Sequence, residues 1–356
     1  MRNRAVGSNA LTAGFSSRSG GHAVGKICIS LGLLFLLSCQ PATLFDINPD
    51  DPAGQDVSQW RDAFDYGDAG VLSGVWGSAP DDVFIVGGTF DQGEVRHFDG
   101  KSWQKTLLPD TPLLIWVFGF GPDDVYAVGV AGTLVHYDGR SWRSVETGVD
   151  VGLWGVWGSK PNDIWIVGGD VGEGTPRILH YDGVDFVTIA VPENDRGATA
   201  LFKVWGIGSK VFAVGEHGLI LQFEGGDWRQ VPAGAAADDD FVSLWGASED
   251  RIVAVGGRGA ARIARYDGSI WTTEKFGQTP GLSAVFMTNA QEAVVGGVNG
   301  YIGTFDSLTS SLETESTRTL ECIHAIWSDG QGTFYAVGGS FSVPFSGIAL
   351  VRTESR

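Results

Sequence analysis

The sequence predicts an all-β protein, a seven-bladed β-propeller of four-stranded antiparallel blades, and three observations lead to that prediction. A unit of about 40 residues occurs seven times. The units divide into short apolar runs separated by turn residues, and the last unit stops before its fourth run. A period of roughly 40–45 residues is typical of propeller blades.

The repeat is anchored by an apolar residue followed by an aromatic one and then, in five copies, glycine. The aromatic anchors are Trp76, Phe118, Trp157, Trp205, Trp245, Phe286 and Trp327. Consecutive anchors are separated by 42, 39, 48, 40, 41 and 41 residues. This regular spacing predicts that each copy folds as one unit of the same size.

Each copy divides into four predicted strands. The anchor run is followed by turn residues such as Pro-Asp-Asp and then by an alternating run such as "DVYAVG" at 124–129. The stretch "HYDGRSW" at 136–142 places Asp138 and Gly139 between two further runs. We expect a two-residue hairpin of the primed type there, because that turn needs positive φ, which glycine and aspartate tolerate. Trp142 should then begin the outer strand and cover a neighbouring sheet.

The seventh copy contains three runs and then ends at Arg356. At the other end of the repeat region, "VSQWRD" at 57–62 resembles the outer strands of other copies but follows no earlier blade. We therefore predict that residues 57–62 supply the outer strand of the last blade. The two ends of the repeat region would then close the ring together.

Residues 1–38 are predicted to be a lipoprotein signal peptide. A basic region ends at Lys26 and an apolar run extends to Leu37, which is too short to span a bilayer. The stretch "LLSC" at 36–39 resembles the lipobox of bacterial lipoproteins, and this resemblance implies that Cys39 is lipidated. Gln40 after the cysteine implies an outer-membrane rather than an inner-membrane location in the bacterial envelope.

The proline-containing residues 39–56 are then the lipidated cysteine and a flexible tether, and residues 57–356 form the propeller. Removal of residues 1–38 takes away four of the 24 basic residues and leaves 20 against 42 acidic residues, a formal net charge of −22. Because so negative a surface repels phosphate backbones, nucleic acid is excluded as a partner. We also predict that the protein is a monomer.

The repeat is similar to several known propeller repeats. Its double glycine followed by Tyr-Asp and Trp resembles kelch repeats, and it also resembles the Asp-box repeats of sialidases and photosystem-assembly propellers. It is most similar to bacterial lipoproteins with "VWGSxPDDVFAVG…HYDGxxW" repeats. This resemblance covers residues 57–356 and implies the fold, whereas fold alone does not determine activity.

The sequence contains no recognisable catalytic motif. The GxSxG, HExxH, CxxC and phosphate-loop patterns are absent, so we predict no catalytic residues, no cofactor and no enzymatic activity. The carboxylate pairs at 81–82 and 123–124 recur with the repeat and are assigned to turns. His97, His136 and His180 occupy equivalent positions in successive copies and should lie too far apart to share a metal ion.

Residues that vary between copies are the better candidates for a specific site. The loops joining second to third strands and those joining one blade to the next should lie on one face, and loops on a rigid scaffold commonly carry binding. The candidate binding residues in these loops are Phe90, Asp91, Glu94, Asp170, Glu173, Asp238, Asp239, Asp240 and Phe341.

These observations favour a lipid-anchored, non-enzymatic binding or scaffold module that recognises another protein or a surface polymer through its loops. The alternative is a carbohydrate-active enzyme or lectin with a carboxylate-lined site at the propeller mouth. A third hypothesis, suggested by the acidic loops, is a scaffold stabilised by Ca²⁺.

Overall fold

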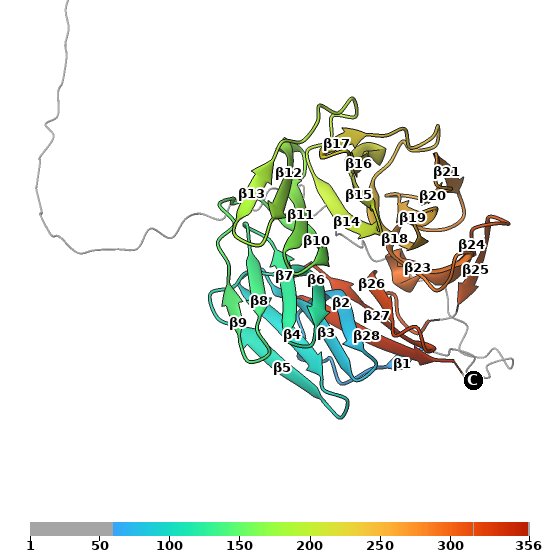
Figure 1. The fold of residues 1–356 in the computed structure, drawn as a ribbon. Helices are drawn as coiled ribbons and strands as arrows, with labels where there is room; N and C mark the ends of the chain where they lie inside the picture. Colours follow the sequence, from blue (N-terminus) through green and yellow to red (C-terminus); the bar gives the residue numbers. More distant parts are fainter. Residues whose placement is uncertain (1–59, 316, 355–356) are drawn as a thin grey trace, which may run out of the picture.

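The computed structural model describes residues 60–315 and 317–354, which form seven four-stranded antiparallel sheets around one axis (Figure 1). The predicted fold class and blade number are therefore confirmed. Residues 39–56, predicted to be the lipidated cysteine and its tether, lie outside the described residues. In the part of the chain that is described, no helix is long and apolar enough to cross a membrane.

The first four blades follow one another along the chain, each with its strands in sequence order from the axis outward. Blade 1 consists of β2 (Val71–Ala79), β3 (Asp82–Thr89), β4 (Gln92–Phe98) and β5 (Trp103–Leu108), and blade 2 of β6 (Leu114–Gly121), β7 (Asp124–Gly129), β8 (Leu134–Tyr137) and β9 (Trp142–Ser144). Blade 3 consists of β10 (Leu153–Lys160), β11 (Asp163–Asp170), β12 (Glu173–Tyr181) and β13 (Phe186–Ile189), and blade 4 of β14 (Leu201–Ile207), β15 (Lys210–Gly215), β16 (Ile220–Glu224) and β17 (Asp227–Gln230).

The remaining blades have the same plan except for the last strand of blade 7. Blade 5 consists of β18 (Phe241–Ser248), β19 (Arg251–Gly256), β20 (Ala261–Tyr266) and β21 (Trp271–Phe276), and blade 6 of β22 (Leu282–Met287), β23 (Glu292–Gly297), β24 (Ile302–Asp306) and β25 (Ser311–Glu315). Blade 7 consists of β26 (Ile323–Ser328), β27 (Thr333–Ser340), β28 (Ser346–Thr353) and β1 (Arg61–Asp62). Two short 3₁₀ turns, η1 (Glu216–Gly218) and η2 (Val298–Gly300), follow β15 and β23.

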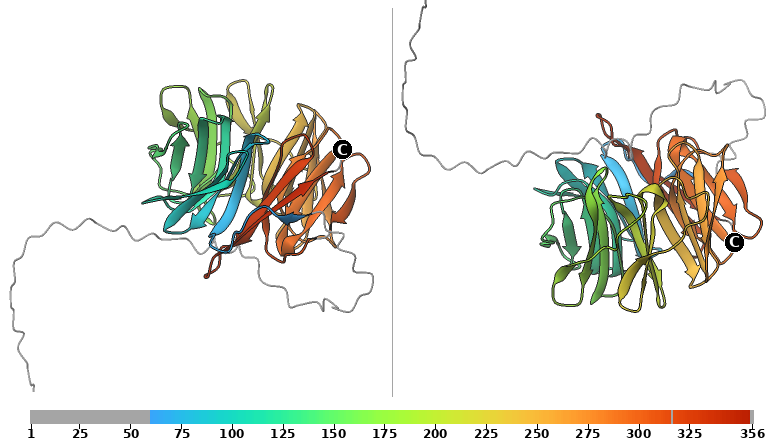
Figure 2. Two further views of the ribbon diagram at one scale, coloured as in Figure 1. Left: turned by 90° about the horizontal axis from the view of Figure 1, so that it is seen from below. Right: turned by 90° about the horizontal axis from the view of Figure 1, so that it is seen from above.

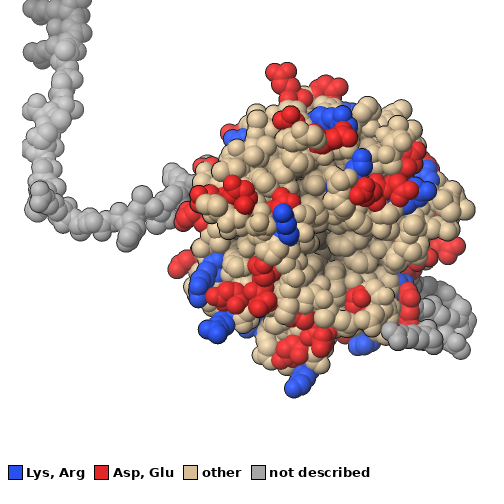
Figure 3. Space-filling view, viewed as in Figure 1, with Lys and Arg blue, Asp and Glu red and all other residues tan. Residues whose placement is uncertain are grey.

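The antiparallel order gives the propeller two different faces. One face carries the turns between second and third strands and the segments between blades, and we call it the loop face. The opposite hairpin face carries the turns between first and second strands and the hairpins between third and fourth strands. In the side views the turn between β27 and β28 projects from the loop face (Figure 2). The hairpin face, seen in Figure 3, has a hollow at the axis surrounded by acidic and basic side chains.

The ring is closed by both ends of the repeat region, as predicted. Arg61 pairs with Val351 and Asp62 with Leu350, so β1 is the outer strand of blade 7. The backbone N–H of Ala63 also donates to the carbonyl of Ala349 at 2.9 Å. Residues 57–59 of the predicted strand lie outside the described part of the chain.

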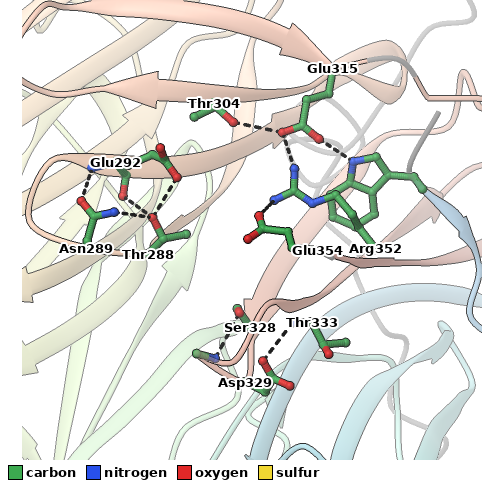
Figure 4. Close-up of polar contacts among 12 residues, drawn as sticks. Thr288, Asn289, Glu292, Thr304, Glu315, Ser328, Asp329, Thr333, Arg352 and Glu354 are labelled. Carbon is green, nitrogen blue, oxygen red and sulfur yellow. Dashed lines mark hydrogen bonds and ion pairs between the residues drawn. The ribbon is translucent and has the colours of Figure 1, made fainter. Parts of the chain in front are cut away.

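Side chains join the closing strand to blade 6. Trp60 is only 3% exposed, and its indole N–H donates to Glu315 Oε2 at 2.7 Å. The other oxygen of Glu315 accepts hydrogen bonds from Arg352 Nη1 at 2.8 Å and from the hydroxyl of Thr304 at 3.0 Å. Figure 4 shows the guanidinium of Arg352 between Glu315 and Glu354. One carboxylate therefore connects the outer strands of the last two blades.

The inner strands pack against each other through their Trp-Gly pairs. A Cβ atom on Gly119 would lie 2.7 Å from Cη2 of Trp76, which belongs to the preceding blade. The same relation joins Gly206 to Trp157 and, across the closure, Gly77 to Trp327. Glycine follows the anchor because the indole of the preceding blade occupies the space of a side chain. This contact explains why glycine follows the aromatic anchor in several copies, which the repeat period alone did not explain.

Gly119→Ala is expected to lower the free energy of unfolding by about 1–2 kcal/mol, since overpacking a filled interior forces neighbours to shift. The new methyl group would meet both the indole of Trp76 and the backbone carbonyl oxygen of Asp124, the latter at 2.8 Å. Chemical denaturation measures the effect. Gly121→Ala in the same strand is the control, because the nearest atom to its Cβ would be 3.6 Å away. Equal losses in the two variants would contradict the packing argument.

The outer-strand tryptophans cover neighbouring blades, as expected. Trp142 of blade 2 lies edge-on to Phe84 of blade 1, with ring centroids 6.2 Å apart. Trp271 of blade 5 contacts Phe212 of blade 4 in the same way at 5.3 Å. The hydrophobic core therefore lies between adjacent sheets. The aromatic anchors cover it near the axis, and the outer-strand tryptophans cover it at the periphery.

The Asp-Gly hairpins differ from the expected two-residue turn. Four residues, 138–141, connect β8 to β9, and only Gly139 has a positive φ, of 81°. Asp138 instead accepts the backbone N–H groups of Arg140 and Ser141 through Oδ1, at 3.0 and 2.9 Å. Aspartate is suited to this position because its short side chain can satisfy the turn's own donors. Among the described hairpins between third and fourth strands, the two-residue loop is the one at Gly225 and Gly226, which both have positive φ.

The recurrent histidines and aspartates form internal pairs. Nε2 of His97 lies 2.7 Å from Oδ1 of Asp82, and His136 and His180 form the same contact with Asp124 and Asp163. Each imidazole also stacks on an aromatic ring of the second strand, as His97 does on Phe84 at 3.9 Å. The last aspartate of each Pro-Asp-Asp or Pro-Asn-Asp turn thus links the turn between the first and second strands to the third strand of its own blade.

Candidate functional site

The seven inner strands each carry a β-bulge at the same position, three residues before the aromatic anchor. A bulge re-aims one side chain out of the regular alternation and is frequently found next to sites. Because the inner strands begin at the loop face, these residues surround the axis near that face. We call them the bulge ring: Ser73, Ile115, Trp154, Phe202, Val242, Ser283 and His324.

The bulge residues of blades 2, 3 and 4 are large and apolar and pack with residues of the loop-face turns. Trp154 and Phe202 are each 6% exposed, and their rings meet edge to face at 6.0 Å. They form one cluster with Ala200, against which Phe90, Ile115, Val130 and Val171 pack. The same bulge position therefore contributes to one apolar cluster from three blades.

A second loop-face cluster continues the apolar layer towards blade 7. It contains Val71, Leu113 and Phe341, with Phe90, Ile115, Val130 and Phe345 packed against it. Phe90 and Phe345 meet edge to face, with centroids 5.0 Å apart. Since the two clusters share three residues, the layer is continuous from blade 7 through blade 1 to blade 4. We call its partly exposed members the apolar arc: Phe90, Ile115, Val130, Val171 and Phe345.

The structure places the predicted aromatic residues in or under this arc. Phe90 belongs to the β3–β4 turn and is partly exposed, whereas Phe341 is 4% exposed and lies 4.8 Å from the ring of His324. The loops around Phe90 and Glu173 are shorter than expected, because β4 and β12 begin at Gln92 and Glu173. Val343, at the tip of the β27–β28 turn, is 82% exposed.

The predicted acidic residues of blades 1 and 3 are in three different environments. Asp91 and Glu173 are exposed, and neither forms an ion pair with another of the described residues. Asp170 is partly exposed and accepts the backbone N–H of Gly152 at 3.1 Å. Glu94 is 3% exposed and forms an ion pair with Arg96 at 2.6 Å. Two of these four carboxylates are therefore free to meet a partner.

The acidic residues of blade 5 are paired with arginines. Asp240 is 1% exposed and binds Arg258 Nε at 2.8 Å, and Asp239 accepts the backbone N–H of Arg258 at 3.0 Å. Asp238 binds Arg262 Nε at 2.8 Å, and this hydrogen bond lowers the pKa of its carboxyl group. The loop face thus has an apolar half with two exposed, unpaired acidic residues and a polar half in which Asp238 and Asp240 pair with arginines.

The axis itself is filled by inner-strand side chains and leaves a cavity of only about 10 Å³, enough for roughly one water molecule. Lys203 of β14 is 6% exposed there, and its Nζ lies 2.7 Å from the ring centroid of Trp116. No hydrogen bond or ion pair joins this amine to another described residue. Burial lowers the pKa of Lys203 well below its ordinary value.

Lys203→Met is expected to raise the free energy of unfolding at neutral pH by about 1–2 kcal/mol, because a buried amine without a polar partner is costly. The lowered pKa means that the unfolded chain binds more protons, so wild-type stability should rise as the pH rises towards about 10. Urea midpoints of wild type and variant at neutral and alkaline pH measure both effects. Lys160→Met, at an exposed position, is the control. A parallel pH dependence in wild type and Lys203→Met would contradict the assignment.

The described residues do not bring together a metal site or a group of converging carboxylates at the mouth. Nowhere in residues 60–315 and 317–354 is there a cluster of three or more His, Cys, Asp or Glu side chains able to hold a metal ion. Burial also lowers the pKa of His324 to about 4, although a hydrogen bond to the carbonyl of Gly339 opposes the shift. The ring of His324 is thus neutral near pH 7 and belongs to the apolar surroundings of Phe341.

The residues that sequence reasoning missed are mainly those of the bulge ring and the turn residues Val130, Val171 and Phe345. A signal was present in the sequence. The position three residues before the aromatic anchor varies among Ser, Ile, Trp, Phe, Val and His, whereas the position before it is always Leu, Ile or Phe. Variation inside a repeated strand is therefore as informative here as variation in the loops.

No protein-family model and no curated protein matches the sequence. Similar solved structures are β-propellers of low identity. "YCF48 bound to D1 peptide" is 13% identical over 84% of this chain and 98% of that chain, with a TM-score of 0.63. The WD40 propeller domain of Doa1 is 10% identical over 84% and 98%, with a TM-score of 0.64. The WD40 repeats of RRP9 are 9% identical over 83% and 97%, with a TM-score of 0.65. At such identities the likeness establishes the fold.

Proposed function

We propose that this chain is a non-enzymatic binding module that recognises another protein through its loop face. The observation that supports the proposal most directly is the continuous apolar layer across five blades, of which the apolar arc is the accessible part. Contiguous apolar surface on a protein with so high a net charge favours a binding site over a solvated rim. The fold is suited to the task, since the similar propeller YCF48 was solved with a bound peptide.

The proposal includes the lipid anchor at Cys39 and a location in the bacterial envelope, at the outer membrane. Its support is the order of basic region, short apolar run, Ser38 and Cys39. Labelling cells with an alkyne fatty acid should modify the wild-type chain and leave Cys39→Ala unlabelled, with the variant lost from the membrane fraction. An unlabelled wild-type chain would remove the anchor from the proposal and leave the binding module.

The loop face can be tested in cells that produce the full chain. A photo-crosslinking residue replaces Phe90 on the loop face or, as a matched control, Ile270 in a hairpin of the opposite face, whose side chain is 62% exposed. Crosslinks to a defined protein from the first position and not from the second are the expected result. The same crosslinked protein from both positions would reject the loop face as the binding surface.

The carbohydrate-active or lectin alternative is not favoured by the geometry. Such a site needs carboxylates that converge at the mouth, whereas Glu94 and Asp240 are buried in ion pairs with arginines and apolar side chains surround the mouth. The proposed module is a monomer without cofactor. Calorimetry with and without a chelator distinguishes it from a Ca²⁺-stabilised scaffold, whose melting temperature would fall when the chelator is added.

A further inference from the structure

The two halves of the loop face differ in whether their charged and apolar side chains have partners within the protein. In the half formed by blades 4 and 5, Arg258 and Arg262 bind Asp240 and Asp238, and Arg196 Nη1 donates to the carbonyl of Ala237 at 2.6 Å. These charged side chains already have partners within the protein and offer little for a ligand to pair with. The half formed by blades 7, 1, 2 and 3 carries the apolar arc, whose side chains are partly exposed. A ligand is therefore expected to bind to this half.

The arc is supported from below and is therefore a preformed surface. Trp154 is fixed because its indole N–H donates to the carbonyl of Gly169 at 2.7 Å, and Phe202 packs against its ring. Phe90 is held between this pair and Phe345. A ligand that covers the arc would bury apolar area without first ordering the surface, which favours affinity.

Negative charge accompanies the arc. Asp91 directly follows Phe90 in its turn, and Glu173 lies two residues after Val171; both are exposed and unpaired among the described residues. An anionic membrane surface is repelled by such a site, and so is a second copy of this strongly acidic chain. A segment that combines apolar side chains with lysine or arginine satisfies both features.

We infer that the apolar arc of blades 7 to 3 binds a short protein segment whose aromatic or aliphatic side chains cover the arc and whose basic residues pair with Asp91 and Glu173. This inference rests on the proposed function and specifies the chemistry of its partner. Val343 is 82% exposed in the β27–β28 turn, two residues before Phe345, and we expect it to contact the same segment.

The test begins with random dodecapeptides displayed on phage and selected against the full chain. We expect the enriched peptides to combine at least two large apolar residues with a net positive charge. Fluorescence anisotropy of the labelled consensus peptide then gives the affinity. Phe90→Ser with Phe345→Ser should weaken binding at least about tenfold, since aromatic anchors dominate such contacts. Asp91→Asn with Glu173→Gln should weaken binding and reduce its sensitivity to salt.

Matched controls distinguish binding at the arc from nonspecific hydrophobic binding. Val184 and Ile270 are 77% and 62% exposed in hairpins of the opposite face, so Val184→Ser with Ile270→Ser should leave binding unchanged. Val343→Ser provides a second variant, next to the arc, in case loss of Phe90 impairs folding, because the side chain of Val343 is exposed and supports no core. Urea midpoints of all variants show which of them are folded.

Several outcomes would overturn the inference. These are selection of acidic or purely polar peptides, equal loss in the opposite-face control, or binding to vesicles of phosphatidylglycerol that the arc variants abolish. A concentration-dependent dimer that the arc variants disperse would likewise identify a second copy as the occupant. If crosslinks in cells come from the loop face but no apolar, basic peptide is selected, the proposed function stands and this inference fails. If no crosslinks come from that face, both fail.

Discussion

Trp60→Ala is expected to lower the free energy of unfolding by about 3–5 kcal/mol, the usual cost of truncating a buried tryptophan. Trp60 precedes the closing strand and is 3% exposed. Its loss removes the hydrogen bond to Glu315 and uncovers Arg352, whose guanidinium lies 5.3 Å from the indole ring. The effect should exceed that of most single substitutions, because β1 is the outer strand of blade 7 and no other described strand can take its place.

Urea denaturation monitored by circular dichroism measures the loss. Trp60→Phe is the matched variant, since it keeps an aromatic ring over Arg352 and removes only the N–H donor. We expect it to lie between wild type and Trp60→Ala. Deletion of residues 40–63 should destabilise the protein more than Trp60→Ala does and give a lower melting temperature. A deletion variant that melts with the wild type would show that the ring does not depend on this strand.

Acidification from about pH 6.5 to pH 4 is expected to lower the stability of the wild-type chain by up to about 3 kcal/mol through His324 alone. Burial lowers the pKa of His324 to about 4, from 6.5 in an exposed histidine. Between these values the unfolded chain binds a proton that the native chain does not, so the contribution is complete above about 6.5 and is lost as the pH falls towards about 4.

The comparison that isolates His324 is with His324→Gln, whose amide can still donate to the carbonyl of Gly339. Urea midpoints at about pH 7, 5.5 and 4.5 should separate the two proteins progressively, with the wild type losing more. Asp68 and Asp306 do not obscure this window, because hydrogen bonds lower the pKa of each carboxyl group to about 2. Parallel curves for the two proteins would show that His324 is not shielded from water.

The fold could be predicted from the sequence because each of its determinants is local and occurs seven times. Alternating apolar runs, glycine at strand ends and Asp-Gly hairpins each specify a strand or a turn within a few residues. The closure could also be predicted, since a ring of antiparallel blades must supply an outer strand that the last repeat lacks. What the repeat could not specify was the hairpin geometry, because Asp138 can either adopt positive φ or accept backbone N–H groups.

The candidate site could be predicted only in part. The loop face and Phe90 followed from topology, but Glu94 and Asp240 were expected at an open surface and instead are buried beside Arg96 and Arg258. Their partners lie two and 18 residues away, and no periodic pattern in the sequence indicates which acidic side chain turns inward. The number of exposed acids was therefore overestimated, whereas the apolar content of the face was underestimated.

The sequence by itself determined the blade number, the strand order and the face on which variable loops gather, since these follow from period and alternation. Only the tertiary structure decided that the bulged residues of three inner strands and the turns of four blades form one apolar surface. The physical reason is that a β-bulge departs from the two-residue alternation on which sequence patterns depend. The direction of Trp154 or Phe202 is thus set by the neighbouring blades, which lie about 40 residues or more away in the chain.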